Sequence, residues 1–171
     1  LKLERAREID PRSAPTLVAL QQNYILQRRY TEARDVGQAA IALVPGDINI
    51  VEWQAMGYLG QGDLKGAREV IRAAIDRGNP APAVAAFFGG YQEVSWALED
   101  AERQLLFRLT PAAFDNDRAW WGQTMAIAHW QQGNMALARA YADSSLPATA
   151  VQVAASPRDG QTHGLHVLMQ A

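Results

Sequence analysis

Residues 30–45 read YTEARDVGQAAIALVP, and residues 64–75 read LKGAREVIRAAI, a similar pattern 34 positions later. In both segments an Ala-Arg pair follows the first residue by three positions, and a third such pair follows Met135. The pairs are Ala33-Arg34, Ala67-Arg68 and Ala138-Arg139. Because a fixed period of this length is typical of stacked helical hairpins, the repeat predicts an all-α protein built from paired helices.

The composition excludes several other classes of protein. Of the 171 residues, 49% are hydrophobic and 20% are charged, so a folded chain is expected. The net charge of -2 and the absence of a long basic stripe argue against nucleic acid as a partner. No apolar stretch is long enough for a membrane span, and no signal peptide is visible. We therefore expect no membrane contact and a cytoplasmic location.

The repeat divides the chain into segments of one continuous domain over residues 1–171. We expect the end of a partial repeat at 1–11, a repeat at 12–45, a repeat at 46–80, a divergent repeat at 81–114, an extended repeat at 115–157, and the first helix of a truncated repeat at 158–171. Both ends cut into repeats, which indicates a piece of a longer protein.

Capping residues predict where the helices begin. Ser13 and Asp63 are suited to cap helices of the first two repeats, and one of residues 115–117 is suited to cap the first helix of the extended repeat. In the divergent repeat we expect one helix over residues 81–94 and a return helix that starts at Ser95. In the extended repeat we expect a helix over residues 135–155, longer than the other return helices and bent or interrupted near Pro147.

The residues at fixed positions of each segment resemble the tetratricopeptide repeat (TPR) family. In the first repeat the matching residues are Leu17, Leu20, Tyr24, Ala33, Ala40 and Pro45. In the second they are Val51, Ala55, Tyr58, Ala67, Ile71 and Ala74. The later repeats match at Phe88, Gly89, Ala101, Leu105, Met125, Ala126, Ala138 and Ala142. The chain departs from the family pattern at Gln21, Gly37 and Gln54.

The resemblance implies a right-handed superhelical solenoid of antiparallel helix pairs. The sequence is also similar to TPR segments of large bacterial regulatory proteins. The small residues Ala33, Ala67, Ala101 and Ala138 would then lie where helices cross closely.

In a TPR-like solenoid the first helix of each pair lines the concave face, and there we place the candidate partner-binding residues. They are Gln22, Ile25, Glu52, Met56, Leu59, Glu93, Trp120, Gln123, Ile127 and Trp130. The two tryptophans are equally suited to a groove or to the core, whereas Trp121 is better suited to the core. Glu52 and Glu93 favour a neutral or basic ligand over an acidic one.

One binding mode known in the TPR family is not expected here. Some members hold an acidic peptide terminus with Lys, Asn and Arg side chains across the groove. The corresponding positions carry no cation in this chain, since they are Val18, Gln22, Trp53, Ala83 and Phe87.

The sequence offers no catalytic or cofactor-binding motif. No cysteine is present, and no G-x-S-x-G, P-loop or H-E-x-x-H pattern occurs. His163 and His166 lie three residues apart and could reach one metal ion, but a third ligand is not evident. We therefore predict a protein that is not an enzyme and has no cofactor or metal site.

The predicted function is a protein–protein interaction module that binds a peptide or a partner helix in its concave groove. The alternative is a self-association scaffold that forms a homo-oligomer by stacking exposed repeat ends, since a cut solenoid leaves an apolar face without a cap.

The repeat register makes a stability prediction at Ala67. Ala67→Leu should lower the free energy of unfolding by about 1–3 kcal/mol, because the larger side chain overpacks a close helix crossing. The measurement is a urea denaturation curve, and an unchanged midpoint would show that the register is wrong.

Overall fold

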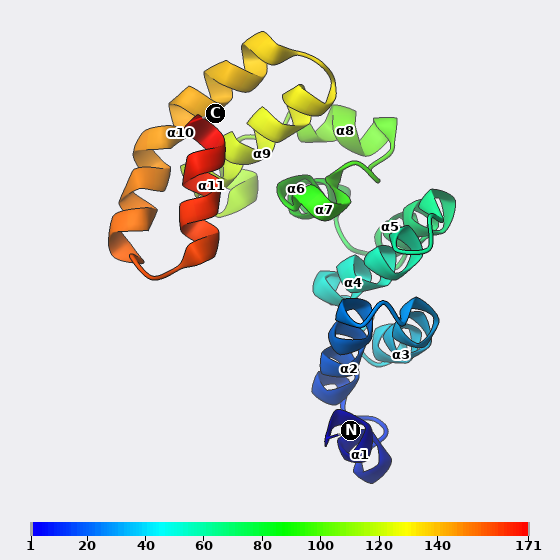
Figure 1. The fold of residues 1–171 in the computed structure, drawn as a ribbon. Coiled ribbons are helices and arrows are strands. Elements are labelled where there is room, and N and C mark those ends of the chain that lie inside the picture. Colours follow the sequence, from blue (N-terminus) through cyan, green and yellow to red (C-terminus); the bar gives the residue numbers. More distant parts are fainter. Residues whose placement is uncertain (1, 171) are drawn as a thin grey trace. The chain divides into compact units, whose positions relative to one another are not determined.

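The computed structural model describes residues 2–170, and all regular secondary structure in this part of the chain is helical. It contains eleven α-helices and one short 3-10 helix, without a strand among the described residues. Figure 1 shows the fold as a ribbon. The predicted all-α fold is therefore confirmed. The helices belong to two compact units. The first contains the described residues up to Val84 together with Ala97–Glu99, and the second contains Ala85–Trp96 and the chain from Asp100 onward.

Five helices form most of the first unit. They are α1 (Lys2–Ile9), α2 (Ala14–Leu26), α3 (Tyr30–Leu43), α4 (Ile48–Leu59) and α5 (Leu64–Asp76). Helix α2 packs against α1, α3 and α4, and α4 also packs against α3 and α5. The predicted caps are confirmed, since Ser13 Oγ accepts a hydrogen bond from Thr16 N and Asp63 Oδ1 accepts one from Gly66 N.

The links between paired helices repeat one backbone geometry. Arg29 N donates to Tyr24 O at 2.8 Å, and 34 positions later Asp63 N donates to Tyr58 O at 3.0 Å. In the second unit Asn134 N donates to His129 O at 2.9 Å in the same way. The residue before each donor has a positive φ, and these residues are Arg28, Gly62 and Gly133. This is the left-handed ending that closes many α-helices, so the sequence period corresponds to a recurring local structure.

Two buried glutamines join helices α2, α3 and α4. Gln21 Nε2 on α2 donates to Gln54 Oε1 on α4 at 3.0 Å, and Gln54 Nε2 donates to Arg34 O on α3 at 3.1 Å. Both side chains are buried, and Gly37 on α3 provides their space. A Cβ at Gly37 would lie 2.0 Å from Gln21 Nε2 and 2.2 Å from Gln54 Oε1. The three departures from the TPR pattern therefore compensate for one another.

Small residues lie in the interior at most of the positions predicted for close helix crossings. Ala33 and Ala67 are completely buried, and Ala138 is buried in the second unit. Ala101 is exposed, so the prediction for that position is wrong. The helix that contains Ala101 begins at Asp100, and not at Ser95 as predicted.

Residues 81–106 form three short α-helices, where the sequence predicted one helix and the start of a return helix. They are α6 (Ala81–Gly90), α7 (Gln92–Ser95) and α8 (Asp100–Leu106). The helix predicted over residues 81–94 ends at Gly90, and Ser95 closes α7 instead of capping a return helix. Gly90 packs against the indole of Trp120, where a Cβ would lie 2.2 Å from Nε1, and Tyr91 takes an extended conformation. The glycine pair makes the helix weak at this point, and the packing favours its end.

The segment Ala97–Glu99 explains why the return helix starts late. These residues belong to the first unit, where Arg68 Nε donates to Ala97 O at 3.2 Å and Arg72 pairs with Glu99. Ala97 and Leu98 are buried. Because their backbone is held in these contacts, α8 begins only at Asp100.

The second unit continues with the short helix η1 (Pro111–Phe114), α9 (Arg118–Gln131), α10 (Met135–Ala155) and α11 (Gly160–Gln170). Helix α9 packs against η1 and α10, and α10 packs against α11. Asp117 caps α9, as predicted for residues 115–117, because its Oδ1 accepts from Ala119 N at 2.8 Å and from Trp120 N at 3.0 Å.

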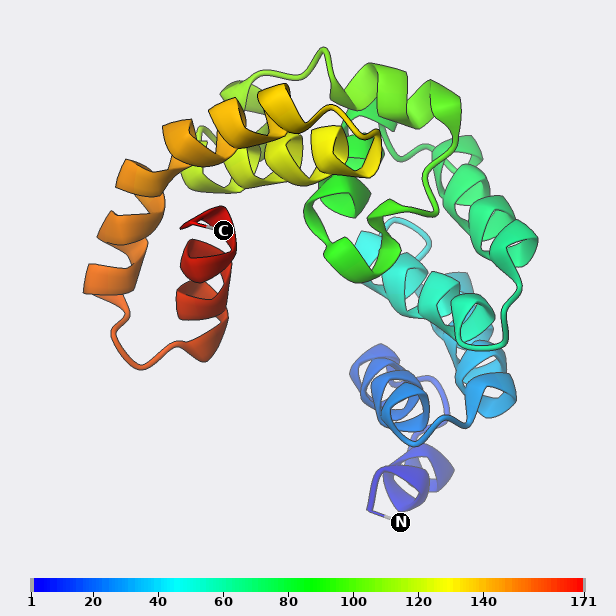
Figure 2. The same cartoon turned by 45° about the horizontal axis from the view of Figure 1, so that its top comes forward.

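The long helix predicted for the extended repeat is confirmed. Helix α10 has 21 residues, whereas α3 has 14 and α5 has 13. It continues through Pro147 without an interruption, and Figure 2 shows that it bends along its length. A proline inside a helix removes one backbone hydrogen bond and favours such a bend.

The glutamine pair makes a stability prediction at Gly37. We expect Gly37→Ala to lower the free energy of unfolding by about 1–3 kcal/mol, because the new methyl group displaces two enclosed glutamine side chains. This cost opposes the gain of about 1 kcal/mol that alanine normally brings to a helix interior.

The matched control is Gly164→Ala in α11, where a Cβ would meet nothing within 4 Å. Urea denaturation should show stabilisation for this control and destabilisation for Gly37→Ala. Stabilisation of both variants would contradict the packing described for Gly37.

Candidate binding groove

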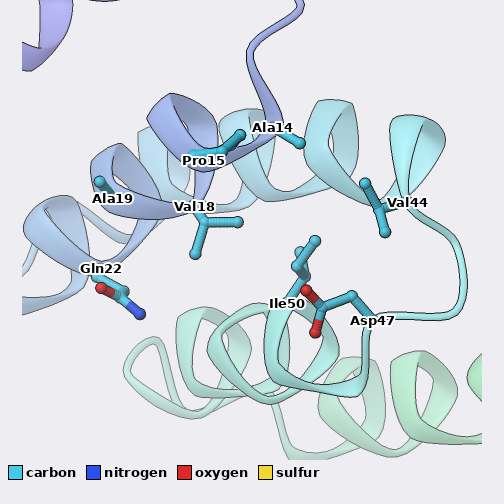
Figure 3. Close-up of a pocket in the computed structure, with 8 residues that line it drawn as sticks. All are labelled: Ala14, Pro15, Val18, Ala19, Gln22, Val44, Asp47 and Ile50. Carbon is cyan, nitrogen blue, oxygen red and sulfur yellow. The ribbon is translucent and has the colours of Figure 1, made fainter.

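A groove of about 520 Å³ lies beside α2 and α4 in the first unit, and Figure 3 shows the residues that line it. Five of them come from α2, two from the link between α3 and α4, and one from α4. They are Ala14, Pro15, Val18, Ala19, Gln22, Val44, Asp47 and Ile50. Six of the eight side chains are aliphatic, so the lining is mainly apolar.

One stripe of α2 forms the first wall of the groove. Pro15, Val18, Ala19 and Gln22 are spaced three, four and seven residues from the first, which places them on one helix face. Val18 also packs against the core formed by α2, α3 and α4, so its side chain is held in place. The short side chain of Ala19 leaves open the space that a larger residue would fill.

The second wall comes from the end of α3 and the start of α4. Val44 is the C-cap residue of α3 and is 38% exposed, so its side chain is accessible from solvent. Ile50 is completely buried and contributes the floor of the groove. Asp47 is the N-cap residue of α4, where its Oδ1 accepts hydrogen bonds from Asn49 N and Asn49 Nδ2, both at 3.0 Å.

The two polar side chains lie at opposite ends of the groove. In Figure 3, Gln22 and Asp47 are separated by Val18 and Ile50. The Gln22 amide makes no hydrogen bond to any of residues 2–170, so both its donor and its acceptor are available. This arrangement can contact an apolar side chain at the centre and polar groups at each end.

The structure places one of the predicted partner-binding residues of the first unit in this groove, namely Gln22. Ile25 is buried in the core of α2, α3 and α4, and Met56 packs against the same core. Glu52 is also buried, and Leu59 is half-buried. Ile25 and Glu52 therefore contribute to the interior in this structure.

The remaining predicted residues belong to the second unit. Gln123 and Ile127 are buried, Glu93 is exposed, and Trp130 is 61% exposed. Trp120 is half-buried. The expectation that at least one of Trp120 and Trp130 is partly exposed is confirmed.

Trp120 and Trp121 pack against neighbouring residues, whereas most of the Trp130 side chain is in solvent. The ring of Trp120 meets Phe114 edge-on at a centroid distance of 5.1 Å and also covers Gly90. Trp121 Nε1 donates to Leu109 O at 3.0 Å, and its ring meets Tyr141 edge-on, although the side chain is half-buried and not fully in the core. Of Trp120 and Trp130, it is therefore Trp130 whose ring is accessible to a partner.

Sequence reasoning missed Pro15, Ala19, Val44 and Asp47 as groove residues. The spacing of Pro15, Val18, Ala19 and Gln22 was a usable signal, because it marks one face of a helix. No comparable signal exists for Val44 and Asp47. They reach the groove through the packing of α3 and α4, which a local pattern does not encode.

His163 and His166 have hydrogen-bond partners among residues 2–170, and His129 packs between two aromatic rings. His166 Nδ1 lies 2.7 Å from Thr149 Oγ1, and His163 Nε2 lies 3.2 Å from Pro157 O. His129 is stacked between Phe107 and Tyr141, and burial lowers its pKa. Among residues 2–170, no three metal-ligating side chains are grouped so that they could hold an ion.

None of the helices in the described part of the chain combines the length and the apolar character that a membrane crossing requires.

No protein-family model matches the chain, and no curated protein matches it significantly. The chemistry of the groove is therefore the basis for assigning a function.

The different environments of the two tryptophans lead to a stability prediction. Trp120→Ala should lower the free energy of unfolding by about 2–4 kcal/mol, because it removes the contacts with Phe114 and Gly90. Trp130→Ala is the matched control and should change it by less than about 0.5 kcal/mol, because most of the ring is in solvent. Chemical denaturation measures both, and equal losses would contradict the assignment of Trp120 to packing.

Proposed function

We propose that this chain is a non-catalytic protein-interaction module, and that its α2–α4 groove binds a peptide or a helix of a partner protein. The observation that supports this most directly is an apolar groove with an unpaired amide, Gln22, at one end. Pockets that bind ligands are commonly apolar with a few polar groups that fix orientation. The volume of about 520 Å³ is within the range of such sites.

The lining suggests how a protein segment would bind. An apolar side chain of the partner would contact Val18 at the centre of the groove, since Ile50 is completely buried beneath the surface. The Gln22 amide would exchange hydrogen bonds with the partner's backbone, since it offers both a donor and an acceptor. An amphipathic helix or an extended segment can present side chains in this way. The lining contains no nucleophile and only one carboxylate, which favours binding over catalysis.

The proposal includes the TPR relationship and the solenoid arrangement. The recurring link geometry at Tyr24–Arg29 and Tyr58–Asp63, 34 positions apart, supports a repeat architecture. The packing of α2 with α3 and of α4 with α5 is what helix pairs of this family would form. On this basis the module would be part of a larger bacterial regulator and would act in the cytoplasm.

A groove-filling variant tests the proposal. The probes are an array of ten-residue, alanine-based peptides with blocked ends, each with one Leu, Val or Phe and one Lys, Gln or Glu at varied spacing. Binding is measured by NMR chemical-shift changes at the Gln22 amide and at the Val18, Val44 and Ile50 methyl groups. Peptides that bind should shift these signals together.

Ala19→Trp should weaken this binding more than about tenfold, because the indole occupies the groove that the partner's side chain needs. The matched control is Ala42→Trp on α3, an exposed position outside the groove, which should bind as the wild type does. Both variants are first checked for an unchanged denaturation midpoint. If no peptide shifts the groove signals, or if Ala19→Trp binds normally, the proposed function is wrong.

Self-association is the second candidate, and exposed apolar side chains on the second unit favour it. Val151 on α10 and Val167 and Leu168 on α11 are 69%, 60% and 42% exposed. Packing of such side chains against a second copy would bury apolar area. Light scattering across a concentration series separates the two candidates, since a monomer at high concentration removes this one.

A further inference from the structure

We infer that the partner segment bound by the groove carries a Lys or Arg side chain that pairs with Asp47. The ligand class is therefore an apolar segment with a cationic residue, and acidic segments are rejected. This inference rests on the proposed function of the same groove and specifies the chemistry of its occupant.

The charge of the groove lining is the first argument. Asp47 is the only ionisable residue among the eight that line the groove. Within the described part of the chain Asp47 forms no ion pair, so its charge is not neutralised by a Lys or Arg of this protein. An acidic residue placed here would meet a like charge without a compensating cation, and such contacts are costly at interfaces.

The geometry of the carboxylate is the second argument. Oδ1 of Asp47 is occupied by its two bonds from Asn49, which hold the side chain in a fixed orientation at the start of α4. Oδ2 receives no hydrogen bond from residues 2–170. A carboxylate has room for several donors, so Oδ2 can accept from an ammonium or guanidinium group. Because Asp47 is only partly exposed, the attraction is less screened than at a fully exposed site.

The opposite end of the groove does not select for charge. Gln22 is neutral and can donate or accept, and Figure 3 places it away from Asp47, beyond Val18 and Ile50. The groove would therefore contact the partner's polar backbone at Gln22, an apolar side chain at the centre, and a cation at Asp47.

The chain provides a matched control for Asp47. Asp63 caps α5 with the same side-chain chemistry, since its Oδ1 accepts from Gly66 N at 2.8 Å. Asp63 is exposed and does not line the groove. Asn caps helices about as well as Asp, so Asp47→Asn and Asp63→Asn both retain the cap and remove one charge.

The experiment compares peptides of the array that differ only in Lys, Gln or Glu at the position that binds best. For the wild type we expect the Lys peptide to bind about three- to tenfold more tightly than the Gln peptide, and the Glu peptide to bind least. Asp47→Asn should remove the preference for Lys over Gln. Asp63→Asn should retain the wild-type preference.

Salt provides an independent readout. The affinity of the wild type for the Lys peptide should fall as NaCl rises, and this dependence should be reduced in Asp47→Asn but not in Asp63→Asn. If Gln and Glu peptides bind in the groove as tightly as Lys peptides, the inference is wrong while the proposed function stands. If no peptide shifts the groove signals, the proposed function fails, and the inference fails with it.

Discussion

The hydrogen bond between Gln21 and Gln54 is the interaction on which the geometry of the first unit depends. Gln21 Nε2 lies 3.0 Å from Gln54 Oε1 and 3.5 Å from Ile50 O, so one amide joins α2 to α4 at two points. Gln54 joins α4 to α3 through Arg34 O. Buried amide bonds of this kind are directional, and a shift of one helix past another would leave both glutamines without partners. The cost of this design is visible at Gln21 Oε1, which is buried without a hydrogen-bond partner among residues 2–170. The same bonds fix the groove, because Gln22 follows Gln21 in one wall and Ile50 forms the floor.

The helix boundaries that the sequence predicted well are those set by local chemistry. Ser13, Asp63 and Asp117 cap helices through hydrogen bonds to residues two or three positions away, so the pattern is contained in a few neighbouring residues. The boundaries that failed depend on distant partners. The end of α6 reflects the packing of Trp120 on Gly90, and the late start of α8 reflects the bond from Arg68 to Ala97 O. Neither contact follows from the residues near the boundary, which is why a helix over residues 81–94 was a reasonable but incorrect prediction.

For the candidate site, the repeat register predicts the helix face on which a residue lies but not how deeply that residue is buried. The TPR register predicted that first-helix residues face a groove, and Gln22 is the predicted residue of the first unit that lines the groove beside α2 and α4. Register does not determine how deeply each side chain is covered, because burial depends on the neighbouring helix. Ile25 is one turn from Gln22 and is buried, whereas Ala19 is one turn away in the other direction and lines the groove. The departures from the TPR pattern at Gln21, Gly37 and Gln54 also could not be explained from the sequence one residue at a time. Their contacts in the structure show that the space beside Gly37 on α3 is filled by the long side chains of Gln21 from α2 and Gln54 from α4.

The proposed role of Asp47 connects the fold of the first unit to the proposed selectivity of the groove. Capping α4 requires a short side chain with an acceptor, and it does not require a charge, since Ser13 caps α2 as a neutral residue. A negative charge at a helix N-terminus is favourable, so Asp is stable at this position even when the groove is empty. The folded protein therefore keeps a carboxylate oriented at one end of an apolar groove, with Oδ1 engaged by Asn49 and Oδ2 open to a partner. Binding of a cation does not require this side chain to move or to give up its cap. An orientation already set by folding reduces the entropy that binding would otherwise have to overcome.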